Sequence, residues 1–211
     1  MNLKEIRNQI LQESKPYIIK YGWNENLFLS MKNGSKFTYE EMNVVFPNGY
    51  TTLLEMYLED INSKMTLKSQ NINLIRLRVH ERIRELFILR LAIMSEEKKL
   101  ISKTFLNLLL PHNYKLALKN LYKTVDQMWF LAGDNSTNFN FYSKRAILAS
   151  IYTGVMIHFV NNDNIEETII LLNKQLKRVS KIPKIKSRIN DITKIIPQFF
   201  KFGKDINFFK Q

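Results

Sequence analysis

Apolar residues at helical spacing on both sides of one polar stretch are the feature that most constrains this fold. Before residues 126–145, the apolar side chains recur every three or four positions, and they do so again after it. The two series are Tyr114, Leu118, Leu121, Val125 and Met128, and then Leu148, Ile151, Val155 and Phe159. This period is that of an amphipathic α-helix. We therefore predict two long helices joined by a short connection, in an all-α protein.

The connection between these helices combines turn chemistry with aromatic surface. Gly133 stands where the first helix should end, and glycine is the usual C-terminal cap. The polar residues that follow suit turns and caps. Five aromatic residues frame them: Trp129, Phe130, Phe139, Phe141 and Tyr142. This is more aromatic surface than a turn needs, so we expect something to pack on it.

The same stretch resembles a known family. From Trp129 to Arg145 it reads W-F-L-A-G-D-N-S-T-N-F-N-F-Y-S-K-R. This string closely resembles the signature of the ubiquinone-biosynthesis accessory proteins, and the likeness is specific over about residues 120–178. Asn138 and Phe141 depart from the family pattern, which has an acidic residue and a tryptophan there. The resemblance implies a TetR-like helical fold, a bound isoprenoid quinone precursor and a partner, the di-iron demethoxyubiquinone hydroxylase.

The resemblance also implies a docking surface for that hydroxylase. The residues that match the family's patch are Asp126, Met128, Phe141 and Tyr142. Alternatively, the aromatic side chains only seal the junction between two helices. We prefer this second interpretation for Trp129, which shares the core stripe. For Phe141 and Tyr142 we favour docking, because the stripe downstream begins on a different face of the helix.

Composition narrows the classes of protein and of binding site that remain. The 211 residues are 45% hydrophobic, enough for one substantial core. Without cysteine there is no disulfide or thiolate site, and His80, His112 and His158 show no metal-ligand spacing, so we expect neither metal nor cofactor. No apolar run could span a bilayer or direct secretion. We expect a cytoplasmic protein, peripheral on the inner face of a bacterial membrane.

Positive charge is concentrated at the C-terminus. The net charge is +13, which favours nucleic acid or an anionic membrane as a partner. Residues 24–60 carry two lysines against six carboxylates, whereas residues 174–211 carry eleven basic residues against two aspartates. The charge distribution therefore favours a membrane contact near the C-terminus over DNA contact near the N-terminus.

Residues 1–50 read as a helix-turn-helix-like three-helix region. A first helix covers about residues 3–20 and should end or kink at Pro16. Asn24 can cap a second helix. Thr38 and Glu41 have the spacing of a capping box, which would begin a third helix. This order resembles TetR-type regulators. The third helix, however, begins with Glu40 and Glu41, and carboxylates oppose a polyanion. We therefore expect no nucleic-acid partner.

Residues 51–180 should form the helical lipid-binding domain. An amphipathic core helix is predicted over about residues 74–94. Its stripe is Ile75, Val79, Ile83, Leu86, Leu89 and Ile93. The neighbouring arginines alternate with Glu81 and Glu85, which favours a solvated ion-pair face. Further helices should cover residues 97–110, 140–160 and 163–179.

Small residues line part of the predicted helix at 140–160. They include Ala149, Ser150, Thr153 and Gly154. Small side chains let a neighbouring helix approach closely or leave room for a ligand, and the pattern alone favours close packing. The family resemblance favours a lipid cavity at these four residues.

Residues 181–211 should form a basic amphipathic C-terminal helix. We predict that its apolar stripe contacts the membrane through Ile192, Ile196, Phe199 and Phe200. Folding back of this stripe onto the body as a final core helix is nearly as well supported by the pattern.

No constellation of catalytic residues emerges from the sequence, so we predict a non-enzyme. The leading hypothesis is an accessory protein that binds polyprenylated quinone precursors at the membrane and presents them to the hydroxylase. The alternatives are a TetR-type DNA-binding regulator with a hydrophobic ligand pocket and a membrane-associated helical protein with an unrelated partner. The pattern leaves a homodimer open.

Overall fold

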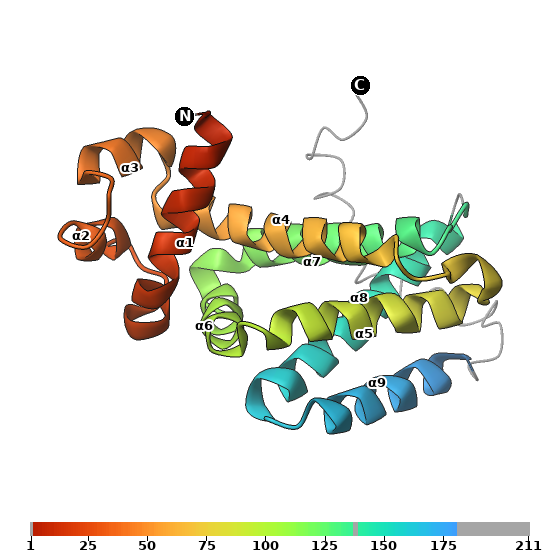
Figure 1. Ribbon diagram of the computed structural model, residues 1–211. Coiled ribbons are helices and arrows are strands. Elements are labelled where there is room, and N and C mark those ends of the chain that lie inside the picture. Colours follow the sequence, from red (N-terminus) through yellow and green to blue (C-terminus); the bar gives the residue numbers. More distant parts are fainter. Residues whose placement is uncertain (1, 137–138, 181–211) are drawn as a thin grey trace.

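The computed structural model describes residues 2–136 and 139–180, and these ranges are all-α, as predicted (Figure 1). The helices and short 3-10 turns (η) are α1 Leu3–Tyr21, α2 Leu27–Met31, α3 Tyr39–Val45, α4 Tyr50–Ser69, η1 Leu74–Arg76, α5 Val79–Ser95, α6 Lys98–Leu108, η2 Pro111–Asn113, α7 Tyr114–Leu131, α8 Phe139–Asn161 and α9 Ile165–Ser180. No described helix is long and apolar enough to cross a bilayer.

Helices α4 and α7 lie side by side and run in the same direction. Lys119 of α7 pairs with Glu55 of α4 at 2.8 Å, and Lys123 pairs with Glu59 at 3.4 Å. These pairs are partly solvated and add little stability, but they fix the register of the two helices. Helix α5 packs against α4 and against α9, and α8 packs against α7 and α9 (Figure 1). The C-terminal ends of α4 and α7 therefore lie at the same end of the bundle.

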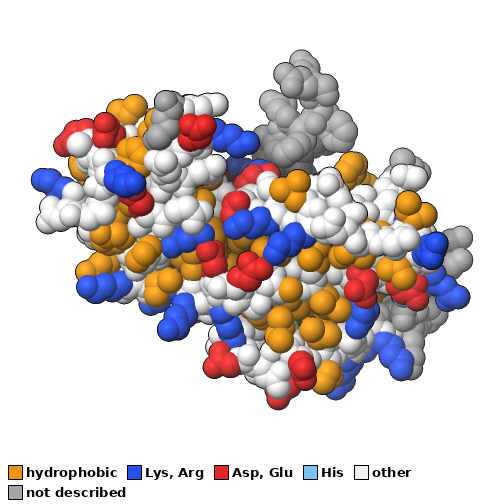
Figure 2. Space-filling model, in the orientation of Figure 1, with side chains coloured by type: hydrophobic (Ala, Val, Ile, Leu, Met, Phe, Trp, Pro, Cys, Tyr) orange, Lys and Arg blue, Asp and Glu red, His pale blue; other side chains and the backbone are white. Residues whose placement is uncertain are grey.

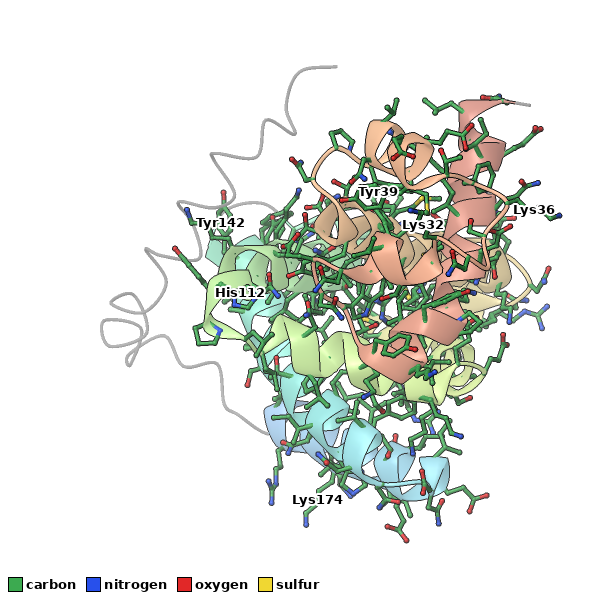
Figure 3. The ribbon with its side chains drawn as sticks, turned by 90° about the vertical axis from the view of Figure 1, so that its left-hand side faces the viewer. Lys32, Lys36, Tyr39, His112, Tyr142 and Lys174 are labelled. Carbon is green, nitrogen blue, oxygen red and sulfur yellow. The ribbon has the colours of Figure 1, made fainter. Side chains whose placement is uncertain are left out.

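The α1–α3 region is fastened to α6. The predicted capping box of α3 is confirmed, because Thr38 accepts the Glu41 amide and Glu41 accepts the Thr38 amide. The Trp23 indole donates to Thr104 of α6 at 3.0 Å, and the Asn107 side chain donates to the Trp23 carbonyl at 3.0 Å. This region, which carries the labelled Lys32, Lys36 and Tyr39, faces the viewer in Figure 3. The TetR-like arrangement and the division at residues 50 and 180 stay predictions.

Near the N-terminus the first helix has nearly its predicted extent, whereas the predicted start of the second helix is wrong. Pro16 does not end the first helix, which continues to Tyr21 because Ile18 is fully buried and anchors the last turn. A proline inside a helix removes one backbone hydrogen bond, here the one to the carbonyl four residues earlier. Asn24 does not cap α2; its side chain accepts the Asn26 amide in a turn, and the helix begins at Leu27.

The helix predicted from residue 74 begins five residues later. The chain is extended at Leu77, and Glu81 caps α5 by accepting the Arg78 amide at 2.7 Å. Arg82 takes the carbonyls of Ile75 and Leu77, which a continuous helix would have used itself. Ile75 and Val79 therefore lie outside the core stripe and are exposed. Arg82 also departs from the predicted ion-pair face, because its guanidinium donates to backbone carbonyls.

A buried arginine joins four helices. Arg90 of α5 is 2% exposed, and its guanidinium donates to Asn62 of α4 at 2.6 Å, Thr124 of α7 at 3.2 Å and Tyr152 of α8 at 3.0 Å. Buried cations require such hydrogen bonds because desolvation otherwise costs several kcal/mol. The Arg90 cluster therefore specifies how α4, α5, α7 and α8 meet.

The predicted membrane-binding residues lie outside the described part of the chain. These are Ile192, Ile196, Phe199 and Phe200. Membrane contact through residues 181–211 stays a prediction.

Candidate functional site

Helix α7 ends in the glycine cap predicted from the sequence. Gly133 has φ +75°, its amide donates to the Phe130 carbonyl at 2.9 Å, and the next amide donates to the Trp129 carbonyl at 3.0 Å. A Cβ atom at Gly133 would lie 3.1 Å from the Arg82 guanidinium, which donates to the neighbouring Ala132 carbonyl. Glycine is therefore favoured here both by the backbone conformation and by the close arginine.

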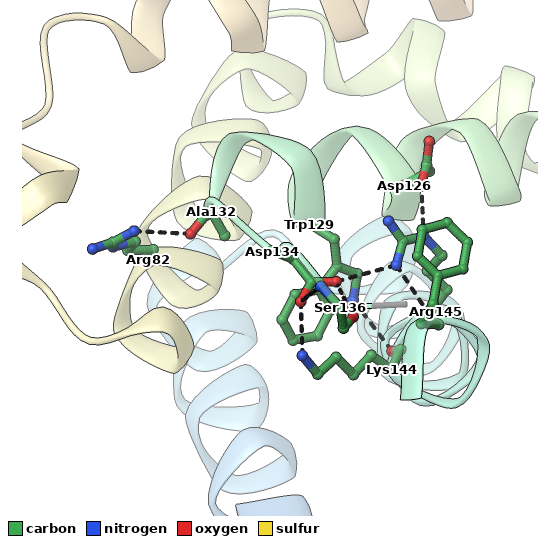
Figure 4. Close-up of polar contacts among 9 residues, drawn as sticks. Arg82, Asp126, Trp129, Ala132, Asp134, Ser136, Lys144 and Arg145 are labelled. Atoms are coloured by element: carbon green, nitrogen blue, oxygen red, sulfur yellow. Dashed lines mark hydrogen bonds and ion pairs between the residues drawn. The ribbon is translucent and has the colours of Figure 1, made fainter. Parts of the chain in front are cut away.

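Asp134 is the centre of the connection between α7 and α8 (Figure 4). Its carboxylate is 3% exposed and accepts hydrogen bonds from Lys144 at 2.7 Å, the Ser136 hydroxyl at 2.7 Å and Arg145 at 3.3 Å. Burial by itself would raise the pKa of Asp134, but the hydrogen bonds from Lys144 and Ser136 outweigh it and lower the pKa below its usual value. The buried group is therefore a paired carboxylate that fixes the start of α8.

Arg145 continues this network toward the aromatic residues. Its side chain is 4% exposed and donates to Asp126 of α7 at 2.6 Å and to the Phe141 carbonyl at 3.0 Å. The guanidinium also lies 3.3 Å from the centre of the Phe141 ring. Asp126 and Phe141, which were predicted to dock a partner, therefore share one buried cation.

Trp129 connects the network to a cavity. Its indole N–H donates to the Lys144 carbonyl at 3.2 Å, so the ring is held where α7 crosses the first turns of α8. The ammonium of Lys144 lies 5.3 Å from the centre of this ring. These two interactions hold Trp129 and Lys144 next to each other in the lining of the cavity.

The cavity has a volume of about 420 Å³ and lies between α5, α8 and α9, with Trp129 of α7 at one side. This volume is in the range of small-molecule sites, about 300–1,000 Å³. Its apolar lining consists of Ile83, Trp129, Ile147, Leu148, Ile151, Leu176 and Val179. Its polar lining consists of His80, Glu81, Arg84, Lys144, Asn173 and Lys177. An apolar lining with several cationic groups suits an amphipathic ligand.

The four predicted docking residues are brought together but differ in exposure. Met128 is fully buried in the core, so its side chain packs beneath the surface that the other predicted docking residues form. Asp126 keeps 41% of its side chain exposed, and Phe141 is half-buried under Tyr142, whose ring centre lies 5.0 Å away. Tyr142 is 43% exposed and points away from the body in Figure 3.

The four small residues predicted to bind lipid do not line this cavity. Ala149 is buried, Thr153 donates to its carbonyl at 3.0 Å, and Ser150 and Gly154 are exposed. The cavity instead uses Ile147, Leu148 and Ile151 of the same helix. Lipid contact at the four small residues stays a prediction.

Several cavity residues carried no distinctive sequence signal. His80, Arg84 and Asn173 come from α5 and α9, which are about 90 residues apart, and the Arg84 guanidinium donates to Asn173 at 2.7 Å. Leu176 lies in the helix predicted over residues 163–179, where an apolar residue signals burial and not a ligand.

Comparison with known proteins agrees with the predicted resemblance. The model of the COQ9 family matches residues 114–183. "Ubiquinone biosynthesis protein COQ9, mitochondrial" of Bos taurus is 27% identical over 156 residues, covering 71% of this chain and 49% of the relative. The protein of the same name from Rattus norvegicus is 56% identical over 45 residues, covering 21% of this chain and 14% of the relative.

A more distant relative covers more of the chain. "Probable ubiquinone biosynthesis protein coq9, mitochondrial" of Dictyostelium discoideum is 21% identical over 170 residues, covering 78% of this chain and 55% of the relative. The chain thus spans about half the length of these longer-matching relatives. The family match includes the α7–α8 connection and the cavity walls from α7, α8 and α9.

The first prediction concerns Asp134. Because its pKa is lower in the folded protein than the roughly 3.9 of an unfolded aspartate, its stabilising effect is present above about pH 4 and is lost as pH falls through the folded pKa. We expect Asp134→Asn to lose about 2 kcal/mol of unfolding free energy at pH 7, because Lys144 and Arg145 lose a buried charged partner. The difference from wild type should shrink below pH 4 in urea titrations.

The matched control is Asp163→Asn. Asp163 also pairs with a lysine, Lys98 at 2.8 Å, but its carboxylate is fully exposed. This variant should unfold like wild type at pH 7. Equal effects of the two substitutions would contradict a special role for the buried carboxylate.

Proposed function

We propose that this chain, whose residues 114–183 are a COQ9-family segment, is a non-catalytic lipid-binding accessory protein of ubiquinone biosynthesis. It takes a polyprenylated quinone precursor from the membrane surface and presents it to a hydroxylase, which performs the chemistry. The proposal combines the name of the relatives with the cavity found in this chain. The family match covers residues 114–183, and we extend the proposed role to the whole chain.

The observation that carries the proposal is the cavity between α5, α8 and α9. Seven of its thirteen lining residues are apolar, and they would remove an isoprenoid chain from water, at about 25 cal/mol for each Å² buried. The polar lining residues include Asn173, Lys144 and Arg84, which could donate hydrogen bonds to the oxygen atoms of a quinone-type ring. The ligand would therefore lie with its ring near these donors and its chain against the apolar walls.

The hydroxylase would dock on the surface around Tyr142. Tyr142 supplies an exposed ring, Phe141 supports it edge-on, and the Asp126 carboxylate is partly exposed beside them. Aromatic side chains held by rigid neighbours are typical interface anchors. Because Lys144 and Arg145 join this surface to Trp129, the docking surface and the cavity share one network.

The DNA-binding alternative is less well supported. The exposed Glu40 and Glu41 occupy the first turn of α3, where a recognition helix would approach phosphates. The names of the relatives also favour ubiquinone biosynthesis.

The second prediction tests the cavity. Ile147 lines it and is 40% exposed, so Ile147→Glu should fold while placing a carboxylate in an apolar site. We expect uptake of a fluorescent quinone precursor analogue to weaken about tenfold or more, because a charge in such a site is strongly unfavourable.

The control is Ile157→Glu on the same helix. Ile157 is 48% exposed and does not line the cavity, so this variant should bind the analogue like wild type. Native mass spectrometry should also find an isoprenoid lipid in the wild-type protein. Equal binding by both variants, or absence of lipid uptake by wild type, would refute the proposed site.

The third prediction tests docking. Tyr142→Ala removes an exposed aromatic anchor, and the affinity for the hydroxylase should fall by about 2 kcal/mol with little change in thermal unfolding. Tyr114→Ala is the control, because Tyr114 is 52% exposed at the other end of α7. Calorimetric titration that gives the same affinity for Tyr142→Ala and wild type would argue against this docking surface.

A further inference from the structure

Large apolar side chains are exposed together at one end of the bundle. They are Leu67 at the end of α4, Ile75 and Val79 before and at the start of α5, and Phe130 at the end of α7. Ile75 is 87% exposed and Phe130 is 72% exposed. We call these four residues the tip. Burial would have been expected for such side chains in a closed core, so their grouping indicates a contact surface.

Hydrogen bonds donated by side chains bring the tip residues together. Thr66 of α4 accepts a hydrogen bond from Gln127 of α7 at 3.1 Å, which aligns the last turns of these parallel helices. Arg82 donates both to the Ile75 carbonyl at 3.2 Å and to the Ala132 carbonyl at 3.0 Å. One guanidinium therefore fastens the α4–α5 connection to the end of α7 and holds the tip in one place.

Charge at the tip matches an anionic surface. Residues 70–80 contain Arg76 and Arg78, both exposed, and no carboxylate. This end lies at the right in Figure 2, where hydrophobic side chains occur beside basic side chains and some acidic ones. Protruding apolar groups beside arginines are the pattern of proteins that lie at the headgroup region of anionic bilayers.

The cavity lies toward the same end of the bundle. Its lining includes His80 and Glu81 from the first turn of α5 and Trp129 from the last turn of α7. Trp129 is next to Phe130 in sequence, so one aromatic ring faces the cavity while its neighbour faces solvent. The tip and the cavity are therefore built from the same helix ends.

We propose that the tip inserts into the headgroup region of an anionic lipid bilayer and that a lipid passes from this bilayer into the adjoining cavity. Ile75 and Phe130 enter the apolar boundary, and Arg76 and Arg78 pair with lipid phosphates. The second half of this proposal rests on the proposed lipid-binding function, whereas insertion of the tip does not. The contact is separate from the one predicted for residues 181–211.

Site-specific labelling tests insertion directly, because the chain contains no cysteine. A polarity-sensitive dye on Ile75→Cys should shift to the blue when the protein binds phosphatidylglycerol vesicles, and nitroxide lipids should quench it. The same dye on Val44→Cys, which is 81% exposed on α3, should do neither. Arg76→Ala and Arg78→Ala should each weaken vesicle binding about fivefold at low salt, and less at high salt.

A double substitution that introduces negative charge at the tip provides the second test. Ile75→Glu with Phe130→Glu should reduce vesicle binding about tenfold or more, whereas Val44→Glu with Ile170→Glu, equally exposed apolar sites elsewhere, should not. The tip variant should still take up a quinone analogue from detergent but not from vesicles.

Three results would overturn the proposal: no vesicle binding, an Ile75 label that stays in water on bound protein, or shielding of that label only by a protein partner. If the tip inserts but wild-type protein takes up no quinone analogue, insertion stands and the proposed function fails.

Discussion

The ion pairs of the buried Asp134 carboxylate are the interactions on which the α7–α8 end of this protein depends. This carboxylate lies between Lys144 and Arg145, which are adjacent in sequence and would repel each other without an anion between them. The network thereby fixes the first turns of α8 against the last turns of α7. Asp126, on the other side of Arg145, joins the surface around Tyr142 to the same network.

The position of α8 then determines where a cavity can form. Ile147, Leu148 and Ile151 face α5 and α9 across the cavity, while Trp129 closes the side toward α7. Deeper in the bundle, the buried Arg90 holds α4, α5, α7 and α8 together through hydrogen bonds to polar side chains. The bundle is thus held together at its middle and contains a cavity toward one end, which is also where the apolar tip is exposed.

Local signals in the sequence predicted local structure well. The Thr38–Glu41 capping box and the Gly133 cap are confirmed because both depend on residues a few positions apart. The family resemblance, based on the string around Gly133, is likewise confirmed by the COQ9 match. Features that depend on residues within about one helical turn can therefore be predicted from the sequence alone.

Features that depend on distant contacts were not predictable. Ile75 and Val79 fit a helical stripe, but Arg82 takes the carbonyls that would have continued the helix, and its third partner is 50 residues away. The cavity combines ends of four helices, so no single stretch of sequence marks it. The small residues at 149–154 could not be distinguished from packing positions for the same reason.

Photocrosslinking with a quinone precursor analogue that carries a diazirine on its isoprenoid chain tests the proposed lipid-binding cavity most directly. We expect labelled peptides from the start of α5, the first half of α8 around Ile147 and Ile151, and α9 around Leu176, all competed by unlabelled analogue. Competable labelling confined to Ser150 and Gly154, or to the α1–α3 region, would contradict this expectation.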